Sequence, residues 1–329
     1  MIRCKDIAVM VGVSRQAVTA VLNNSRPNCV SKEKRAEILR VAAEHNYRPD
    51  HAAIALKTGK SNLIGIVMPP WDNPYIAELC MGIQRRLASH GYTPFFTIDN
   101  YENPVPGNLE QLLSLHVAGM ITVAASILPD DIGIPVVSYY YDDPRFDSVC
   151  PNFQEDSRLI IEHLAACGHT KIGYLGQLQD GRVPHLISEA EDRKMEFPER
   201  WRIGCRDMDY AALFDRLLER NGGKDLPTAL IVHNDNAALQ VMRRIRGRNF
   251  RIPEDISIIG HDDISYCGNA LPALTSVSFG SPDANAEVMV GLLTEQIASF
   301  GRPRKKVLLG SRLIRRESVR SFSGGGPDR

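Results

Sequence analysis

The chain has 329 residues, and its 39 Lys and Arg residues balance 39 Asp and Glu residues. This length suffices for two or three domains with large buried cores. The sequence shows no basic, apolar leader and no apolar run long enough to cross a bilayer, and its seven cysteines are scattered without metal-ligand spacing. We therefore expect a cytoplasmic protein with reduced thiols, no metal and no cofactor, neither secreted nor inserted in a membrane.

Charge is distributed unevenly along the chain. Residues 1–61 carry 11 Lys and Arg against 5 Asp and Glu, whereas the rest of the chain carries 28 against 34. A basic N-terminal segment ahead of an acidic body suits a protein whose one end meets the phosphates of a nucleic acid.

The N-terminal stretch predicts two short helices around a tight turn. Ile7, Ala8 and Val11 recur at helical spacing. Gly12 can adopt a positive φ, and Ser14 can accept a hydrogen bond from a free N–H group at the start of the next helix. This pattern is typical of a helix-turn-helix, although an ordinary helical hairpin with a solvated polar face would look similar.

The second helix of this pair is expected to have two distinct sides. Its apolar side would pack inward and consists of Ala17, Val18, Val21 and Leu22. Its outward side carries donors and acceptors suited to base edges and phosphates in a DNA major groove, namely Arg15, Gln16, Thr19 and Asn23. A third helix, capped by Ser31, is expected to bury Ile38, Leu39, Val41 and Ala42.

The third helix leads into the segment 46–61, and an apolar strand follows at residues 63–68. With these motifs the sequence resembles the LacI/GalR family of bacterial transcription regulators over nearly its whole length. The resemblance implies a helix-turn-helix DNA-binding domain at residues 1–49, a hinge at 50–61, an effector-binding and dimerisation core at 62–320, and a disordered tail at 321–329.

The resemblance also implies which residues meet DNA. Arg15 and Gln16 would reach base edges, where a good bidentate pair contributes about 1–3 kcal/mol of discrimination. Leu56 would enter the minor groove from the hinge and kink the duplex, unless it is a linker residue packed on the core. The expected DNA-binding residues are Ser14, Arg15, Gln16, Ala17, Thr19, Asn23, Ala53 and Leu56. The chain departs from the family's usual residues at Ala20, Asp50 and Ile54.

From residue 62 onward the sequence alternates apolar strands with amphipathic helices. The expected strands are 63–68, 94–98, 119–124, 134–139, 171–175, 229–232 and 256–259. The expected helices are 75–89, 108–115, 156–167, 210–219, 236–246 and 283–300. Continuous apolar strands separated by helices indicate an α/β fold with two doubly wound parallel sheets. The resemblance implies two lobes like those of periplasmic binding proteins, one at about 62–150 and 279–308 and the other at about 153–277 and 310–320.

An effector is expected in the cleft between these lobes, at the carboxyl ends of the strands. By resemblance, the effector-binding residues are Asp72, Tyr75, Arg193, Tyr210, Asn234 and Asp262. Arg193 fits the family pattern Arg-x-x-Gly-aromatic on a helix, except that Glu196 stands in place of the glycine. Alternatively, Arg193 is a surface ion-pair partner, and Asp235 and Asp263 are helix caps.

Catalysis and nucleotide binding are not supported. Asp262 and Asp263 are neighbours at a strand end and would point to opposite sides. The tripeptide Gly59-Lys60-Ser61 precedes a strand, whereas a phosphate-binding loop follows one. We therefore predict a transcription regulator, acting as a repressor, that binds a pseudo-palindromic operator as a homodimer and responds to a carbohydrate or nucleoside. The alternatives are a solute-binding protein or enzyme of the same double-lobed fold, and a DNA-binding regulator without an effector.

Overall fold

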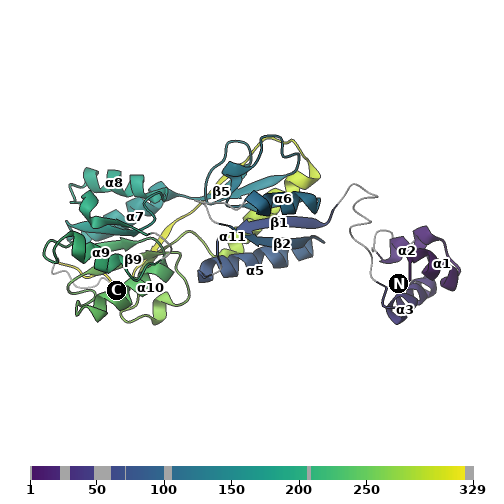
Figure 1. Ribbon diagram of the computed structural model, residues 1–329, viewed down its shortest axis with the longest axis horizontal. Coiled ribbons are helices and arrows are strands. Elements are labelled where there is room, and N and C mark those ends of the chain that lie inside the picture. The colour runs from purple at the N-terminus through teal and green to yellow at the C-terminus, as the bar shows by residue number, and fades with distance from the viewer. Residues whose placement is uncertain are drawn as a thin grey trace. The chain divides into compact units, whose positions relative to one another are not determined.

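The computed structural model describes residues 2–22, 30–47, 61–70, 72–99, 106–205 and 209–322. Contacts within the chain divide it into two compact units, residues 1–62 and 63–329 (Figure 1). Most of the predicted hinge, including Ala53 and Leu56, lies outside the described residues, as does Asn23.

The first unit contains three short helices, α1 (Cys4–Val11), α2 (Arg15–Leu22) and α3 (Lys32–Glu44). Their buried faces form one small core of Ile7, Ala8, Val11, Val18, Val21, Ile38, Val41 and Ala42. Ser31 caps α3 by accepting from the backbone N–H of Lys34 at 3.3 Å. The prediction that Leu39 is buried is wrong, because its side chain is 46% exposed. One residue beyond Ile38 is about 100° further around a helix, which turns Leu39 away from the core.

The second unit contains two six-stranded sheets, which we call the N-lobe and C-lobe sheets. The N-lobe sheet has the order β11-β5-β4-β3-β1-β2, and all of its neighbouring strands are parallel. Its strands are β1 (Leu63–Met68), β2 (Thr93–Ile98), β3 (Gly119–Thr122), β4 (Val136–Tyr139), β5 (Asp147–Pro151) and β11 (Lys306–Leu309). This sheet agrees with the expected doubly wound α/β class.

The C-lobe sheet has the order β12-β10-β9-β8-β6-β7. Its strands are β6 (Ile172–Gly176), β7 (Arg202–Gly204), β8 (Ala229–Val232), β9 (Ser257–His261), β10 (Thr275–Ser278) and β12 (Arg312–Ile314). The β10–β12 pair is antiparallel, and the other pairs are parallel. The chain passes between the lobes three times, after β5, after β10 and after β11.

Helices cover both faces of each sheet, which explains the continuous apolar strands. The N-lobe helices are α5 (Pro74–Ser89), α6 (Pro106–Ser114) and α11 (Pro282–Ala298). The C-lobe helices are α7 (Phe153–Ala166), α8 (Arg182–Asp192), α9 (Leu213–Arg220) and α10 (Asp235–Gly247). Along β8, Ala229 and Ile231 pack in the cluster under α7 and α8, whereas Leu230 and Val232 pack in the cluster with α9 and α10. None of the described helices is long and apolar enough to cross a membrane.

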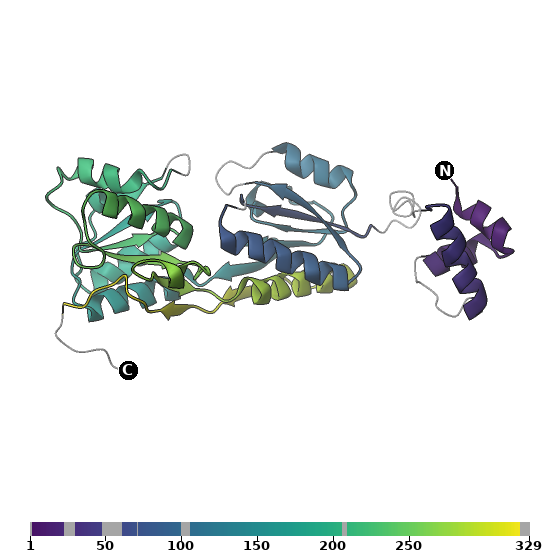
Figure 2. The same ribbon diagram turned by 90° about the horizontal axis from the view of Figure 1, so that it is seen from below.

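Helices α5 and α11 lie side by side against the N-lobe sheet (Figure 2). A side chain at Gly82 would place its Cβ only 2.9 Å from the Cβ of Ala286. Glycine at this position therefore permits the two helices to approach closely.

Candidate DNA-binding face and effector pocket

Helices α1 and α2 form a helix-turn-helix. Gly12 ends α1 with a φ of 70°, which L side chains rarely adopt. Ser14 then accepts a hydrogen bond from the backbone N–H of Ala17 at 3.1 Å and so caps α2. Val18 and Val21 anchor the inner side of α2 in the core. Both the turn and the cap were predicted from the sequence.

The outward side of α2 begins with three exposed residues, Ser14, Arg15 and Gln16. Neither Arg15 nor Gln16 forms a side-chain hydrogen bond or ion pair within the part of the chain that the structure describes, so both can bind an external partner. Ala17 is half-buried beside them, and the hydroxyl of Thr19 donates to the carbonyl of Arg15 at 3.0 Å. Ala20, where the family usually carries arginine, is buried and faces away from this surface.

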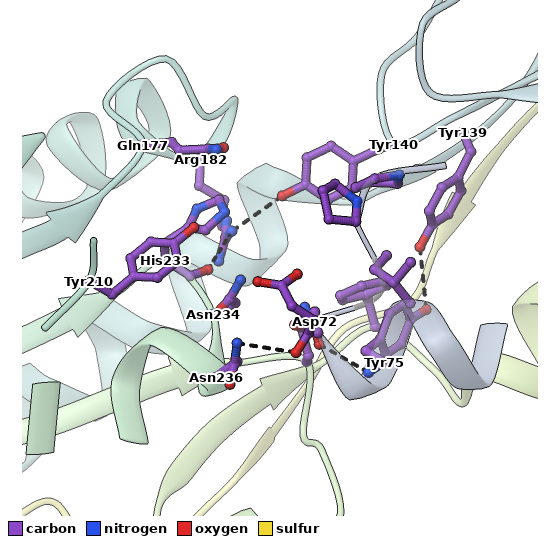
Figure 3. A pocket seen from close by; sticks show the side chains of 16 residues that line it. Asp72, Tyr75, Tyr139, Tyr140, Gln177, Arg182, Tyr210, His233, Asn234 and Asn236 are labelled. Carbon is purple, nitrogen blue, oxygen red and sulfur yellow. Dashed lines mark hydrogen bonds between the residues drawn. The ribbon is translucent and has the colours of Figure 1, made fainter. Parts of the chain in front are cut away.

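The second unit contains a pocket at the carboxyl ends of strands from both lobes (Figure 3). It is concave, partly open to solvent and lined by residues of both lobes, which suits a small molecule. The lining residues are Pro69, Pro70, Asp72, Asn73, Tyr75, Ile76, Tyr139, Tyr140, Gln177, Arg182, Tyr210, His233, Asn234, Asn236, Asp262 and Phe279. Five of the six predicted effector-binding residues are therefore brought together here.

Arg182 is the arginine of this pocket. Its side chain is 2% exposed, and its Nε lies 3.0 Å from Oδ1 of the fully buried Asp180. Nη2 donates to the carbonyl of His233 at 2.9 Å, and the Tyr140 hydroxyl donates to Asp180 at 2.9 Å. Burial opposes ionisation of Asp180, but Arg182 outweighs it and holds the pKa of Asp180 below its ordinary value. The remaining nitrogen, Nη1, is buried without a hydrogen-bond partner in the described structure.

The structure does not place Arg193 among the residues that line the pocket. Arg193 follows the last residue of α8, and Lys194 has a φ of 56°, so the segment after Asp192 is not helical. The Arg193 guanidinium pairs with Glu189 at 2.5 Å and with Glu162 at 3.1 Å. These acidic partners hold it on the α7–α8 surface and leave Arg182, eleven residues earlier, to line the pocket.

His233 and Tyr210 form the adjoining wall in the C-lobe. Their rings stack with centroids 6.3 Å apart and an interplanar angle of 13°. Burial lowers the pKa of His233 to about 4 although Asp180 opposes this change. His233 is therefore neutral at pH 7, and its contact with Asp180 at 3.5 Å is not an ion pair at that pH.

The N-lobe wall begins where α5 begins. Asn73 caps α5 by accepting from the backbone N–H of Tyr75 at 3.0 Å, while Asp72 is exposed beside it. The hydroxyl of Tyr75 accepts from the Asn285 amide at 2.6 Å, and its ring lies 4.8 Å from that of Phe279. Burial raises the pKa of Tyr75 well above its ordinary value, so Tyr75 offers the pocket a neutral aromatic surface.

The remaining predicted residues have local partners as well as a place in the pocket. Asn234 caps α10 by accepting from the backbone N–H of Ala237 at 2.8 Å. Asp262 accepts from the Asn73 amide of the other lobe at 2.8 Å.

Asp235 and Asp263 do not cap helices. Asp235 is buried and accepts from Ser276 at 2.7 Å, and Asp263 pairs with Arg316 at 2.6 Å.

Several pocket residues were not predicted from the sequence: Tyr139, Tyr140, Gln177, Arg182, His233, Asn236 and Phe279. Most of them come at or just after the end of a strand. In a parallel sheet, residues at the carboxyl ends of the strands are candidates for ligand binding. Arg182 carries no such signal, because it opens a helix and is followed by His185 and Leu186 where the family pattern has glycine and an aromatic residue. Among the described residues, no group of His, Cys, Asp or Glu could hold a metal ion.

Comparison with known proteins agrees with both units. Residues 3–50 match the family model for bacterial regulatory proteins of the lacI family, and residues 161–319 match a periplasmic binding protein-like domain. The chain is 27% identical to the HTH-type transcriptional repressor PurR of Mannheimia succiniciproducens, covering 98% of this chain and all of that protein. It is 28% identical to PurR of Haemophilus influenzae strain PittEE, with the same coverage of both chains.

Solved structures share the fold across nearly the whole chain. A crystal structure of the lac repressor dimer bound to operator and the anti-inducer ONPF aligns with a TM-score of 0.79, at 24% identity over 97% of this chain and 99% of that chain. The complex of the transcriptional regulator CelR with cellobiose aligns with a TM-score of 0.68, at 22% identity over 97% of this chain and 100% of that chain.

A helix-turn-helix unit combined with a two-lobed periplasmic-binding-protein-like core defines a DNA-binding transcription regulator. This protein belongs to the LacI family of bacterial regulatory proteins, as the resemblance in its sequence predicted. The curated relatives reported above are transcription repressors and not enzymes.

Proposed function

We propose that this protein is a cytoplasmic transcription repressor that binds a pseudo-palindromic operator as a homodimer, and that a small molecule in the interlobe pocket changes its affinity for DNA. The observation that carries this proposal is the combination of the exposed Arg15 and Gln16 on α2 with a pocket lined from two lobes. The proposed division is a DNA-binding domain at 1–49, a hinge at 50–61 and an effector core at 62–320, in keeping with the boundary between the compact units.

The proposed DNA contacts divide into two roles. Arg15 and Gln16 contact base edges, because both are exposed at the start of α2 and carry two or more donors or acceptors. Ala17 touches a thymine methyl group, and the polar residues around it hold phosphates and set the register. These phosphate-binding residues are Ser14, Thr19 and Asn23. Ala53 and Leu56 of the hinge contact the minor groove.

The lining of the pocket favours an uncharged, hydroxylated effector. Asp180 already neutralises Arg182, and Asp72 and Asp262 add negative charge, so a phosphate group would meet no uncompensated cation among the described lining residues. The side-chain amides of Gln177, Asn234 and Asn236 suit hydroxyl or carbonyl oxygens. The aromatic rings suit a sugar face or a base. The effector is therefore proposed to be a carbohydrate or nucleoside, and the similar fold of the CelR–cellobiose complex supports the first of these classes.

The effector would act through the relative arrangement of the lobes. A ligand can shift DNA affinity only to the extent that it prefers one arrangement over the other. Direct contacts already join the lobes at this pocket: Asn73 donates to Asp262 at 2.8 Å, and Asn236 donates to the carbonyl of Asp72 at 3.3 Å. A bound molecule that contacts residues of both lobes would change the balance between closed and open arrangements.

The proposal is tested by selecting bound duplexes from a random pool with the purified full-length protein. We expect enrichment of a pseudo-palindrome with a flexible pyrimidine–purine step at its centre. Absence of any enriched site at moderate salt, with and without candidate effectors, would contradict the DNA-binding role. Thermal unfolding with a panel of sugars and nucleosides then separates an effector-responsive regulator from one without an effector.

The homodimer is proposed to use an apolar surface of the C-lobe. Leu271 is 76% exposed and Tyr266 is 58% exposed. Beside them, Leu239, Met242 and Ala270 line an apolar groove on α10. Exposed apolar side chains gathered around a groove mark a protein interaction site.

Leu271→Asp is therefore expected to weaken dimerisation by about 2 kcal/mol or more, because an unpaired carboxylate would be buried at the interface. Sedimentation velocity at several concentrations measures the dimer constant. Ile127→Asp, on a 40% exposed apolar residue of the N-lobe, is the control and should leave that constant unchanged. An unaltered dimer in Leu271→Asp would show that the subunits associate elsewhere.

A further inference from the structure

The buried end of β9 contains an imidazole between two carboxylates. His261 is 1% exposed. Its Nε2 lies 3.0 Å from Oδ2 of Asp156 on α7, and its Nδ1 lies 3.2 Å from Oδ1 of Asp262. Asp156 is fully buried, and its other oxygen, Oδ1, has no hydrogen-bond partner in the described structure.

This geometry favours a proton on both ring nitrogens. A neutral imidazole donates from one nitrogen only, whereas an ionised carboxylate only accepts. With both carboxylates ionised, the two contacts call for a donor on each ring nitrogen, which makes His261 an imidazolium. Phe279 stacks on the ring with centroids 5.0 Å apart, and this contact suits a cation.

The charged and titratable groups around His261 and Asp262 come from five elements. Asp235 of α10 interacts with Asp262, and burial together with that carboxylate raises the pKa of Asp235 to about 7. Asp156 lies on α7, Asp262 follows β9, Arg182 lies on α8 and His233 follows β8. Burial and Arg182 oppose the cation, but the two carboxylates outweigh them and raise the pKa of His261 above its ordinary value. His233 is neutral at pH 7 and adds no competing charge there.

Asp262 connects this buried group to the other lobe. Its Oδ1 faces His261, and its Oδ2 accepts from Nδ2 of Asn73 at 2.8 Å. The backbone of Asp262 has a φ of 109°, a conformation that costs energy for any residue other than glycine and persists only where contacts hold it. Asp156, His261, Asp262 and Asn73 therefore form one continuous chain of hydrogen bonds from the interior of the C-lobe to the first turn of α5.

We propose that His261 is a positioning residue whose imidazolium holds the Asp262 carboxylate against Asn73, so that closure of the lobes depends on pH. The inference goes beyond the proposed function and does not require an effector. Because the cationic form makes both contacts, closure is favoured below the pKa of folded His261 and is weakened as the pH rises through that value. Loss of the proton removes one donor and leaves two carboxylates facing a neutral ring.

Nuclear magnetic resonance of the full-length protein labelled with ¹⁵N-histidine tests the charge of this ring. The His261 signals are assigned by their disappearance in His261→Asn, and the pH is varied from 6 to 9. We expect two protonated ring nitrogens at pH 6.5 and a midpoint above the ordinary value for histidine. A single protonated nitrogen at pH 6.5 would overturn the proposal.

Asp156→Asn distinguishes a positioning role from a structural one. The side-chain carbonyl of the substituted residue would still accept from Nε2, but the negative charge would be gone, so the His261 midpoint should fall by about one pH unit or more. His90→Gln, on an exposed histidine, is the control and should leave the midpoint unchanged. An unchanged midpoint in Asp156→Asn would show that the carboxylate does not hold the imidazolium.

The link to the other lobe is measured at the Asn73 side-chain amide in protein labelled with ¹⁵N-asparagine, with Asn73→Ala for assignment. We expect the Asn73 signal to shift with the same midpoint as His261 and to move with it in Asp156→Asn. If His261 titrates while the Asn73 signal stays constant, His261 does not position Asp262. None of these measurements depends on DNA or on an effector, so a failure here is distinguishable from a failure of the proposed function.

Discussion

Arg182→Ala is expected to lower the free energy of unfolding by about 3–5 kcal/mol, the usual cost of removing one partner from a buried ion pair. Asp180 is fully buried and would keep the Tyr140 hydroxyl, the backbone N–H of residue 182 and the contact with neutral His233, but no cation. The same substitution removes a side chain that lines the pocket, so the response of DNA binding to an effector should also be lost. Urea unfolding followed by near- and far-ultraviolet circular dichroism measures the stability and tests whether the transition is two-state.

The pH dependence of the stability loss in Arg182→Ala identifies the cause of that loss. In the intact protein Arg182 holds the pKa of Asp180 below its ordinary value, so the pair contributes stability above about pH 4 that is lost as the pH falls. Without Arg182, burial raises the Asp180 pKa instead, and the defect should be largest near pH 7 and smaller in acid. Asp180→Asn combined with Arg182→Ala should be more stable at pH 7 than Arg182→Ala alone. A double variant no better than the single one would contradict the assignment.

Arg193→Ala is the matched control for Arg182. Arg193 is 28% exposed and pairs with two glutamates at the surface of α7 and α8. Ion pairs of this kind contribute about 0–1 kcal/mol. Arg193→Ala should therefore keep both stability and the effector response. If Arg193→Ala loses the effector response while Arg182→Ala keeps it, Arg193 is the effector-binding residue, as the sequence pattern predicted.

The fold could be predicted largely because its signals are local. The turn at Gly12 and the cap at Ser14 are properties of a few neighbouring residues, and both occur as expected. Strands such as β1 and β8 are continuous apolar runs because helices cover both of their faces. The five strands that were not predicted are β5, β7, β10, β11 and β12. They are three to five residues long, and most mix polar with apolar residues, so their assignment depends on neighbouring strands.

The pocket could be predicted only where a motif occurs in the sequence. Asp72 and Tyr75 lie at the start of α5, and Asn234 and Asp262 come shortly after β8 and β9. They therefore fall where a site at the carboxyl ends of the strands was expected. The choice of Arg193 rested on a sequence pattern that Arg182 does not share, whereas contacts between distant segments decide which of the two arginines lines the pocket. Arg193 is held by Glu162, 31 residues away, whereas Arg182 reaches the carbonyl of His233, 51 residues away. Such partners follow from the tertiary fold and leave no trace in spacing.

Arg15→Ala combined with Gln16→Ala is expected to abolish specific operator binding while leaving the protein folded. Each residue makes one proposed base contact per subunit, and a good contact is worth about 1–3 kcal/mol of discrimination. Across two half-sites the double substitution should therefore cost about 4–12 kcal/mol at most, enough to reduce the selected operator to non-specific affinity. Both side chains are exposed and lie outside the core of Ile7, Val18 and Val21, so the stability of the headpiece should change little.

Titration of the selected duplex and a scrambled duplex at several salt concentrations measures this effect. The loss should fall on the selected duplex, because base contacts distinguish the two sequences while phosphate contacts serve both. Arg40→Ala is the matched control, since Arg40 is an exposed arginine of α3 that pairs with Glu44 at 2.5 Å and lies on another helix. It should retain the preference for the selected duplex. If Arg15→Ala with Gln16→Ala weakens both duplexes equally, these side chains bind the phosphate backbone, and sequence must be recognised by other residues of the headpiece or by the hinge.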